Sequence, residues 1–175
     1  PVREVDAVAP SCGPYLSGKT SLTESLLLAA GAIARKGNAR DRNMVGDSSP
    51  EARARQMSLD VNIASVQWQG DSFTLLDCPG SVEFQHDTAC ALMAADAAVV
   101  VCDPDPERVP LPPPLLRLLE ERHIPHLIFI NKMDAAHRRI RDMMEALQGL
   151  STRKMVLRQV PIRKSGKGGA EELDG

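Results

Sequence analysis

The residues best suited to chemistry form a glycine-containing loop near the start of the chain. Residues 13–20 read Gly-Pro-Tyr-Leu-Ser-Gly-Lys-Thr and fit the pattern G-x-x-x-x-G-K-[ST]. In such a loop the glycines let backbone N–H groups converge on phosphate oxygens, the lysine neutralises the β- and γ-phosphates, and the threonine hydroxyl binds Mg²⁺. We therefore expect a nucleotide-phosphate site made by Gly13, Pro14, Tyr15, Leu16, Ser17, Gly18, Lys19 and Thr20.

Two more motifs follow apolar runs, each where a strand should end. Asp77-Cys78-Pro79-Gly80 comes after residues 73–76, and Asn131-Lys132-Met133-Asp134 comes after residues 127–130. The carboxyl ends of parallel strands meet at one edge of a sheet, so these residues should lie beside the phosphate loop. Asp77 is expected to share a magnesium site with Thr20. Either tetrapeptide alone is a weak signal, but the three motifs in this order argue against a chance turn with a surface lysine.

The last of these motifs has a specific base chemistry. The Asp134 carboxylate can accept two hydrogen bonds from guanine, while Asn131 can meet the O6/N7 edge and the Lys132 stem can pack along the nucleotide. Adenine lacks that donor pair, and an unpaired buried carboxylate costs about 1–3 kcal/mol, so GTP should be preferred over ATP by about tenfold or more. A purely structural alternative is that Asp134 is the N-cap of a helix over residues 135–148, and this role is compatible with guanine binding. An ATP-using P-loop enzyme is a further alternative.

The elements that must position these motifs follow from the spacing of apolar residues. Residues 97–102 are continuously apolar, which is typical of a central parallel strand, and residues 69–72 read as a turn between two strands that form an antiparallel edge. The expected strands are 5–9, 59–68, 73–76, 97–102, 127–130 and 155–162, and the expected helices include 115–122 and 135–147. A further amphipathic helix after the phosphate loop is indicated by the apolar stripe Leu22, Leu26, Leu27, Ala30 and Ile33. The fold class is therefore α/β, a P-loop NTPase with a mostly parallel sheet flanked by helices in three α/β/α layers and one antiparallel edge strand.

Two long segments should lack regular structure. Residues 31–57 have no sustained periodicity and are expected to form a mobile switch loop. The charges in that loop fit solvated loop residues better than an RNA-facing patch. Residues 103–114 hold six of the 13 prolines, so a rigid extended connection is expected there rather than a helix or a central strand. A structural linker is preferred to a partner-binding proline segment.

Composition and charge narrow the class of protein. Hydrophobic residues make up 43% of the chain and charged residues 25%, which is ordinary for a single globular domain. No apolar run approaches the roughly 20 residues that span a bilayer, and the start, at Pro1, suggests a trimmed piece without a signal-peptide pattern. The net charge of -2 argues against a generally basic surface for nucleic acid. The four cysteines form no C-x-x-C pair, so reduced thiols in a cytoplasmic protein are expected and zinc is not.

Together with three further stretches, the motifs resemble the GTP-binding domain of translational GTPases, nearest to elongation factor G and its paralogues. Residues 51–59 (Glu-Ala-Arg-Ala-Arg-Gln-Met-Ser-Leu) are similar to the E-x-E-R-G-I-T-I stretch of that family, residues 78–84 (Cys-Pro-Gly-Ser-Val-Glu-Phe) to T-P-G-H-V-D-F, and residues 157–162 (Leu-Arg-Gln-Val-Pro-Ile) to L-Q-L-P-I. The resemblance covers roughly residues 3–163. It implies a monomeric cytoplasmic protein that binds GTP, GDP and Mg²⁺ and hydrolyses GTP to drive translocation, with the ribosome rather than DNA or a membrane as its partner.

Four positions depart from the family pattern. Ser81 stands where the family has a histidine that is thought to order the attacking water, and Leu16 replaces an aspartate of the phosphate loop. Gln56 replaces a glycine, and Ser58 replaces a threonine while keeping its hydroxyl. Catalysis here depends on positioning and charge stabilisation, so we expect slow hydrolysis with nucleotide binding largely retained. The alternative is a degenerate paralogue that binds GTP as a conformational switch with little or no hydrolysis. The resemblance places the catalytic positions at Lys19, Gly80 and Ser81 and the metal ligands at Thr20, Ser58 and Asp77.

The end of the chain allows two interpretations. A complete guanine site needs one more loop, usually S-A-[KL], and residues 165–167 (Ser-Gly-Lys) lie 31 residues after Asp134, a spacing that suits a small GTPase. The elongation factor G register instead places that loop beyond Gly175. We prefer the second interpretation, in which residues 1–162 are an incomplete GTP-binding domain and residues 163–175 begin an inserted subdomain or form a flexible tail.

Overall fold

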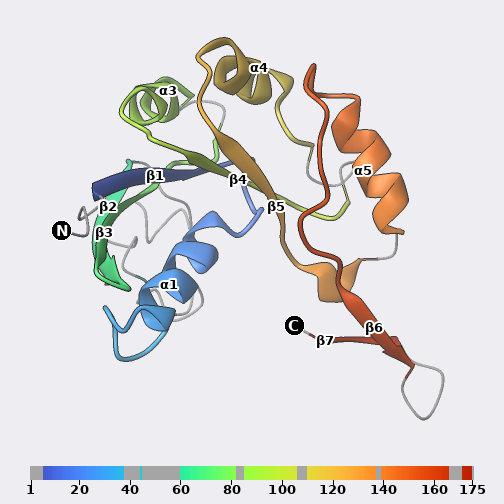
Figure 1. Ribbon diagram of the computed structural model, residues 1–175, viewed down its shortest axis with the longest axis horizontal. Helices are drawn as coiled ribbons and strands as arrows, with labels where there is room; N and C mark the ends of the chain where they lie inside the picture. The colour runs from blue at the N-terminus through green and yellow to red at the C-terminus, as the bar shows by residue number, and fades with distance from the viewer. Residues whose placement is uncertain are drawn as a thin grey trace.

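A five-stranded sheet lies at the centre of the computed structural model, which describes residues 6–37, 44, 60–81, 85–105, 110–136, 139–165 and 171–174 (Figure 1). Its strands are β1 (Asp6–Cys12), β2 (Asn62–Trp68), β3 (Asp71–Asp77), β4 (Ala98–Cys102) and β5 (His126–Ile130). They lie in the order β2-β3-β1-β4-β5, and every neighbouring pair is parallel except β2 with β3. The mostly parallel sheet with one antiparallel edge strand, predicted from the sequence, is confirmed.

The antiparallel edge is a tight hairpin. β2 and β3 pair along their whole length, from Asn62 with Asp77 to Trp68 with Asp71. Gln69 and Gly70 connect them with positive φ angles of 53° and 92°, as expected for a two-residue turn that matches the twist of its strands. The turn was predicted over 69–72, and its last two residues belong to β3.

Helices cover both faces of this sheet. Within the described ranges they are α1 (Lys19–Ala29), α3 (Gln85–Met93), α4 (Pro113–Glu121), the short 3-10 helix η2 (Met133–Ala135) and α5 (Ile140–Gln148). α1 lies on one side of the sheet, and α3 and α4 lie on the other (Figure 1). One apolar cluster joins Val100 of β4 to Leu92 of α3, Leu116 of α4 and Leu147 of α5. The continuously apolar β4 is thus buried between layers, as its sequence predicted.

The predicted helix boundaries are partly wrong next to the loops. α1 begins at Lys19, inside the phosphate-loop motif, and ends at Ala29, so Ala30 and Ile33 of the predicted apolar stripe lie beyond it. The predicted helix over 135–147 is interrupted, because η2 ends at Ala135 and α5 begins only at Ile140, with Arg139 as its N-cap. Asp134 therefore lies in η2 and does not cap α5.

Three further departures concern segments without a clear local signal. α3 was not predicted. α4 begins at Pro113, so the proline connection ends two residues earlier than expected, since the first turn of a helix tolerates proline. The predicted strand over 155–162 is wrong. Residues 154–161 have no regular structure, and β6 (Ile162–Ser165) pairs instead with β7 (Glu171–Asp174) in a separate two-stranded sheet. The apolar residues of 154–161 include Val156 and Val160, which are 81% and 61% exposed and so cover no apolar layer.

Some predictions fall outside the described residues. These include most of the switch loop, residues 38–43 and 45–59, with Gln56 and Ser58 among them, and residues 82–84. Among the helices of the described part, none has the length and apolar character needed to cross a membrane. The four cysteines are free thiols.

Candidate nucleotide-binding site

The phosphate loop connects β1 to α1 in a conformation that needs its two glycines. Gly13 and Gly18 have φ angles of 140° and 94°, which glycine adopts without a steric penalty. A Cβ atom at Gly13 would collide with the carbonyl oxygen of Val101 in β4, and one at Gly18 would collide with the Asn131 side chain. Both positions therefore need glycine for two reasons, the backbone conformation of the loop and the close approach of β4 and of the residue that follows β5.

Lys19 lies at the centre of this loop and is buried. Its ammonium donates a 2.8 Å hydrogen bond to the Pro14 carbonyl, across the loop. Burial lowers the pKa of Lys19, while the charge of Asp77 acts in the opposite direction. A buried cation with one carbonyl acceptor gains from an anionic ligand, so the loop suits a phosphate.

The Asp77 carboxylate, at the end of β3, joins the loop through hydroxyl groups. Thr20 Oγ1 donates to Oδ2 of Asp77 at 2.7 Å, and Ser11 Oγ donates to Oδ1 at 3.2 Å. Thr23 Oγ1 lies 3.4 Å from Ser11 Oγ. Asp77 is 2% exposed. Hydroxyl and carboxylate oxygens are the ligands that Mg²⁺ prefers, so the donor set at Thr20 and Asp77 fits this cation.

Residues 78–80 continue from β3 over the phosphate loop. The Cys78 amide donates to the Ser11 carbonyl at 3.1 Å, and Pro79 O accepts a hydrogen bond from Thr88 of α3. A Cβ atom at Gly80 would collide with Lys19 Nζ and lie 2.8 Å from the Tyr15 amide nitrogen. Gly80 therefore lies against the loop, and the half-buried Ser81 follows it directly.

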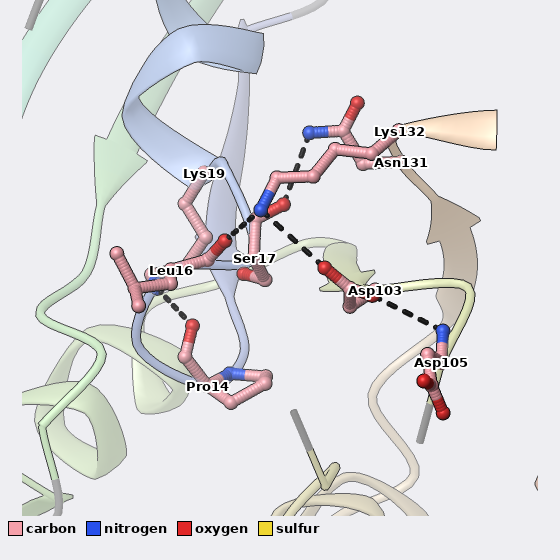
Figure 2. Close-up of polar contacts among 8 residues, drawn as sticks. All are labelled: Pro14, Leu16, Ser17, Lys19, Asp103, Asp105, Asn131 and Lys132. Carbon is pink, nitrogen blue, oxygen red and sulfur yellow. Dashed lines mark hydrogen bonds and ion pairs between the residues drawn. The ribbon is translucent and has the colours of Figure 1, made fainter. Parts of the chain in front are cut away.

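The guanine loop that follows β5, residues 131–134, contacts the phosphate loop through side chains (Figure 2). Asn131 Nδ2 donates to the Ser17 carbonyl at 3.0 Å, and Lys132 Nζ donates to the Leu16 carbonyl at 2.5 Å. Met133 is half-buried and Asp134 is exposed, both in η2. Among the described residues, the structure brings the predicted residues of the three motifs together at one edge of the sheet.

Sequence reasoning missed two polar residues that belong to this cluster. Ser11 binds Asp77, and Asp103 forms a 3.4 Å ion pair with Lys132. Ser11 lies inside a strand and had no signal of its own. Asp103 follows an apolar run just as Asp77 does, and that signal could have identified it.

Comparisons with known proteins agree with this geometry. The family model of the elongation factor Tu GTP binding domain matches residues 11–169. An elongation factor G-like protein of Synechocystis sp. is 47% identical over 163 residues, which are 93% of this chain and 24% of that protein. Peptide chain release factor 3 of Lactobacillus gasseri is 33% identical over 138 residues, 77% of this chain and 26% of that protein.

A solved structure from Thermus thermophilus is also similar. It has a TM-score of 0.73 at 28% identity, and the match covers 82% of this chain and 22% of that one. The chain thus spans about a quarter of the length of the curated relatives that it matches.

Proposed function

The chain belongs to the translational GTPases, the family that carries the elongation factor Tu GTP binding domain, and we propose that it binds GTP and GDP and hydrolyses GTP. The observation that carries this proposal is the meeting of three loops at one sheet edge. Thr20 is hydrogen-bonded to Asp77, Gly80 lies against Lys19, and Asn131 reaches the carbonyl of the phosphate loop. The likeness to an elongation factor G-like protein confirms the resemblance seen in the sequence.

In this proposal the phosphates bind to the backbone N–H groups of residues 13–20 at the N-terminus of α1. The helix dipole and the free N–H groups of its first turn favour an anion there. The Lys19 ammonium, now on the Pro14 carbonyl, would turn to the β- and γ-phosphates. Pro14, Tyr15, Leu16 and Ser17 contribute backbone rather than side-chain contacts.

Mg²⁺ would be held by Thr20 and Asp77, with Ser58 as a further proposed ligand outside the described residues. When bound, the cation supplies positive charge to the phosphates. The Thr20 to Asp77 hydrogen bond already holds the two oxygen donors side by side. Ser11 holds the second carboxylate oxygen, so the orientation of the Asp77 carboxylate is fixed beside Thr20.

Guanine would be selected by the loop after β5. The exposed Asp134 carboxylate is proposed to accept the two guanine donors, with Asn131 at the O6/N7 edge and Lys132 and Met133 packed beside the nucleotide. Asn131 already lies on the Ser17 carbonyl, so the base site and the phosphate site share one contact. A contribution from residues 165–167 is a separate proposal: Ser165 ends β6 and pairs with Glu171.

Hydrolysis would depend on Lys19, Gly80 and Ser81. Gly80 would offer its backbone N–H to the γ-phosphate, which is supported by its close approach to Lys19 and Tyr15. The Ser81 hydroxyl can hold a water but cannot carry a positive charge, so we propose slow hydrolysis. The second candidate, a GTP-dependent switch with negligible hydrolysis, is favoured by this same serine.

For the whole protein we propose a cytoplasmic, monomeric factor that acts on the ribosome, in translocation or a related step. The chain supplies its GTP-binding domain, with residues 1–162 as the domain and residues 163–175 as the start of a further segment. The role in translation is supported by the names of the relatives, an elongation factor G-like protein and a peptide chain release factor 3.

Titration with a fluorescent GDP analogue and single-turnover GTP hydrolysis, each with and without ribosomes, test the proposal. We expect saturable binding, slow intrinsic hydrolysis and acceleration by ribosomes. Binding without acceleration would leave the switch as the function, whereas no binding of either nucleotide would refute both candidates.

Replacing Ser81 by histidine should raise the hydrolysis rate by about tenfold or more, since a positioned acid or base contributes 10²–10⁴-fold. An unchanged rate would show that position 81 does not order the water.

A further inference from the structure

Asp103 is a buried carboxylate that the nucleotide itself is not expected to touch. It directly follows β4, and β4 lies between β1 and β5 in the sheet. The side chain of Asp103 is 1% exposed. It therefore lies between the phosphate loop, which leaves β1, and the guanine loop, which leaves β5 (Figure 2).

Both carboxylate oxygens of Asp103 are hydrogen-bonded. Oδ1 accepts the Asp105 amide at 3.1 Å, and Oδ2 lies 3.4 Å from the ammonium of Lys132. A buried carboxylate is costly unless it is paired and hydrogen-bonded. The ion pair with Lys132 and the bond from the Asp105 amide both help to compensate the burial of this charge.

The same Lys132 ammonium also donates to the Leu16 carbonyl. One cation therefore joins the end of β4, the guanine loop and the phosphate loop. Leu16 and Lys132 both have positive φ angles, 65° and 56°, in a region that costs free energy for residues with a side chain. Such backbone conformations persist where the surroundings fix them, and the ion pair and hydrogen bond of Lys132 connect these two positions.

We propose that Asp103 is a positioning residue for nucleotide binding. It holds the Lys132 ammonium on the Leu16 carbonyl and so keeps the guanine loop at a fixed separation from the phosphate loop. The inference rests on the proposed function, because it assigns a role within that guanine-nucleotide site. Lys132 is 35% exposed, and partly solvated pairs add little stability, so the effect should appear in nucleotide binding more than in folding.

The competing explanation is purely local. The bond from the Asp105 amide makes Asp103 the first residue of a tight turn, and in that case its loss would loosen the turn without acting through Lys132. The two explanations differ in whether the effect of Asp103 depends on Lys132. A double-mutant cycle measures that dependence.

The test uses the dissociation rate of a fluorescent GDP analogue from the full chain, measured after mixing with excess unlabelled GDP. Asp103→Asn keeps the shape of the side chain and removes its charge. We expect dissociation about tenfold faster, because residues in one hydrogen-bond network are strongly coupled and a guanine loop that is no longer held by this network releases the nucleotide more readily. In a Lys132→Met background the same substitution should change the rate less than about twofold. Asp96→Asn is the matched control, since Asp96 precedes β4 and accepts the Val8 amide at the opposite end of the strand.

An off-rate unaffected by D103N, or an equal acceleration in both backgrounds, would overturn the positioning role. If D103N does not fold, D103E and D103Q give the same comparison, because they differ from each other only in charge. D103E should then retain the analogue longer than D103Q, and equal rates would contradict the inference. A lack of analogue binding by the unmodified chain would instead refute the proposed function, and this inference with it.

Discussion

Thr20 Oγ1 donates a 2.7 Å hydrogen bond to Oδ2 of Asp77, a residue 57 positions further along the chain. The contact fixes the start of α1 against the end of β3. Because Ser11 binds the other oxygen of Asp77, the carboxylate has a set orientation before any ligand arrives. Because these side chains are already ordered, binding a ligand here costs little conformational entropy.

Replacing Asp77 by asparagine should remove the Mg²⁺ dependence of nucleotide binding. The amide is neutral and offers one oxygen, so the cation loses a charged ligand. We expect the affinity for GDP in the presence of Mg²⁺ to fall by about tenfold or more, or about 1.4 kcal/mol, with a smaller change when a chelator is present. Calorimetric titration in both conditions checks this. Asp71→Asn, at the other end of β3, is the control, and an equal loss in both conditions would argue against a metal role for Asp77.

Replacing Gly80 by alanine should strain the site. The added Cβ atom would collide with Lys19 Nζ and lie 2.8 and 2.9 Å from the backbone nitrogen and Cα of Tyr15. Backbone cannot yield as a flexible side chain can, so we expect a loss of about 1–3 kcal/mol in the free energy of unfolding and weaker nucleotide binding.

Urea denaturation of two glycine variants tests this expectation. Gly149→Ala is the matched substitution, because the nearest atom to its Cβ would be the Ala146 carbonyl oxygen at 3.4 Å. Gly149 has ordinary helical angles, so alanine should be neutral or slightly stabilising there. Equal stability of the two variants would show that residues 78–80 do not press on the phosphate loop.

Replacing Asp134 by alanine should abolish the preference for guanine over adenine. Its carboxylate is the proposed acceptor for two guanine donors, and a lost charged hydrogen bond costs about 1.5–3 kcal/mol, roughly ten- to a hundredfold in affinity. Competition of GDP and ADP against a fluorescent GDP analogue gives the ratio. Asp142→Ala removes a surface carboxylate that pairs with Arg139 and should leave the ratio unchanged. Retained discrimination in D134A would favour an adenine-tolerant enzyme of a different P-loop class.

The three loops could be predicted because each has a local signal. A phosphate loop has a fixed pattern, and Asp77 and Asn131 each follow an apolar run that had to be a strand. Their contacts could not be predicted in the same way. Asn131 reaches Ser17, and Lys132 reaches Leu16, only because β4 separates β1 from β5 by one strand, and strand order is a property of the whole fold.

The errors have related causes. Asp103 was assigned to a proline-rich connection, since the prolines that follow it dominate the local pattern. The strand predicted over 155–162 is rich in apolar residues, but such a segment becomes a strand only beside a partner, and residues 162–165 pair with 171–174 instead. α3 was not predicted. The helices over 115–122 and 135–147 were predicted from the spacing of their apolar residues, and α4 and α5 lie there.

The junction after α5 provides a last prediction, independent of the nucleotide. Glu120, near the end of α4, accepts hydrogen bonds from the Ser151 hydroxyl and from the hydroxyl and amide of Thr152. The bonds from Ser151 and Thr152 lower the pKa of Glu120 from 4.5 to about 2. Since the folded chain holds the carboxylate charged, this contribution to stability is complete above the unfolded pKa and is lost as the pH falls from about 4.5 towards 2.

Glu120→Gln should therefore be less stable than the unmodified chain near neutral pH, and the difference should shrink in acid. Urea denaturation at a series of pH values from about 7 down to about 3 measures it, and Glu121→Gln, an exposed neighbour on the same helix, reports the generic effect of removing one negative charge. A stability difference for E120Q that stays constant with pH would show that these hydrogen bonds do not favour the charged form of Glu120.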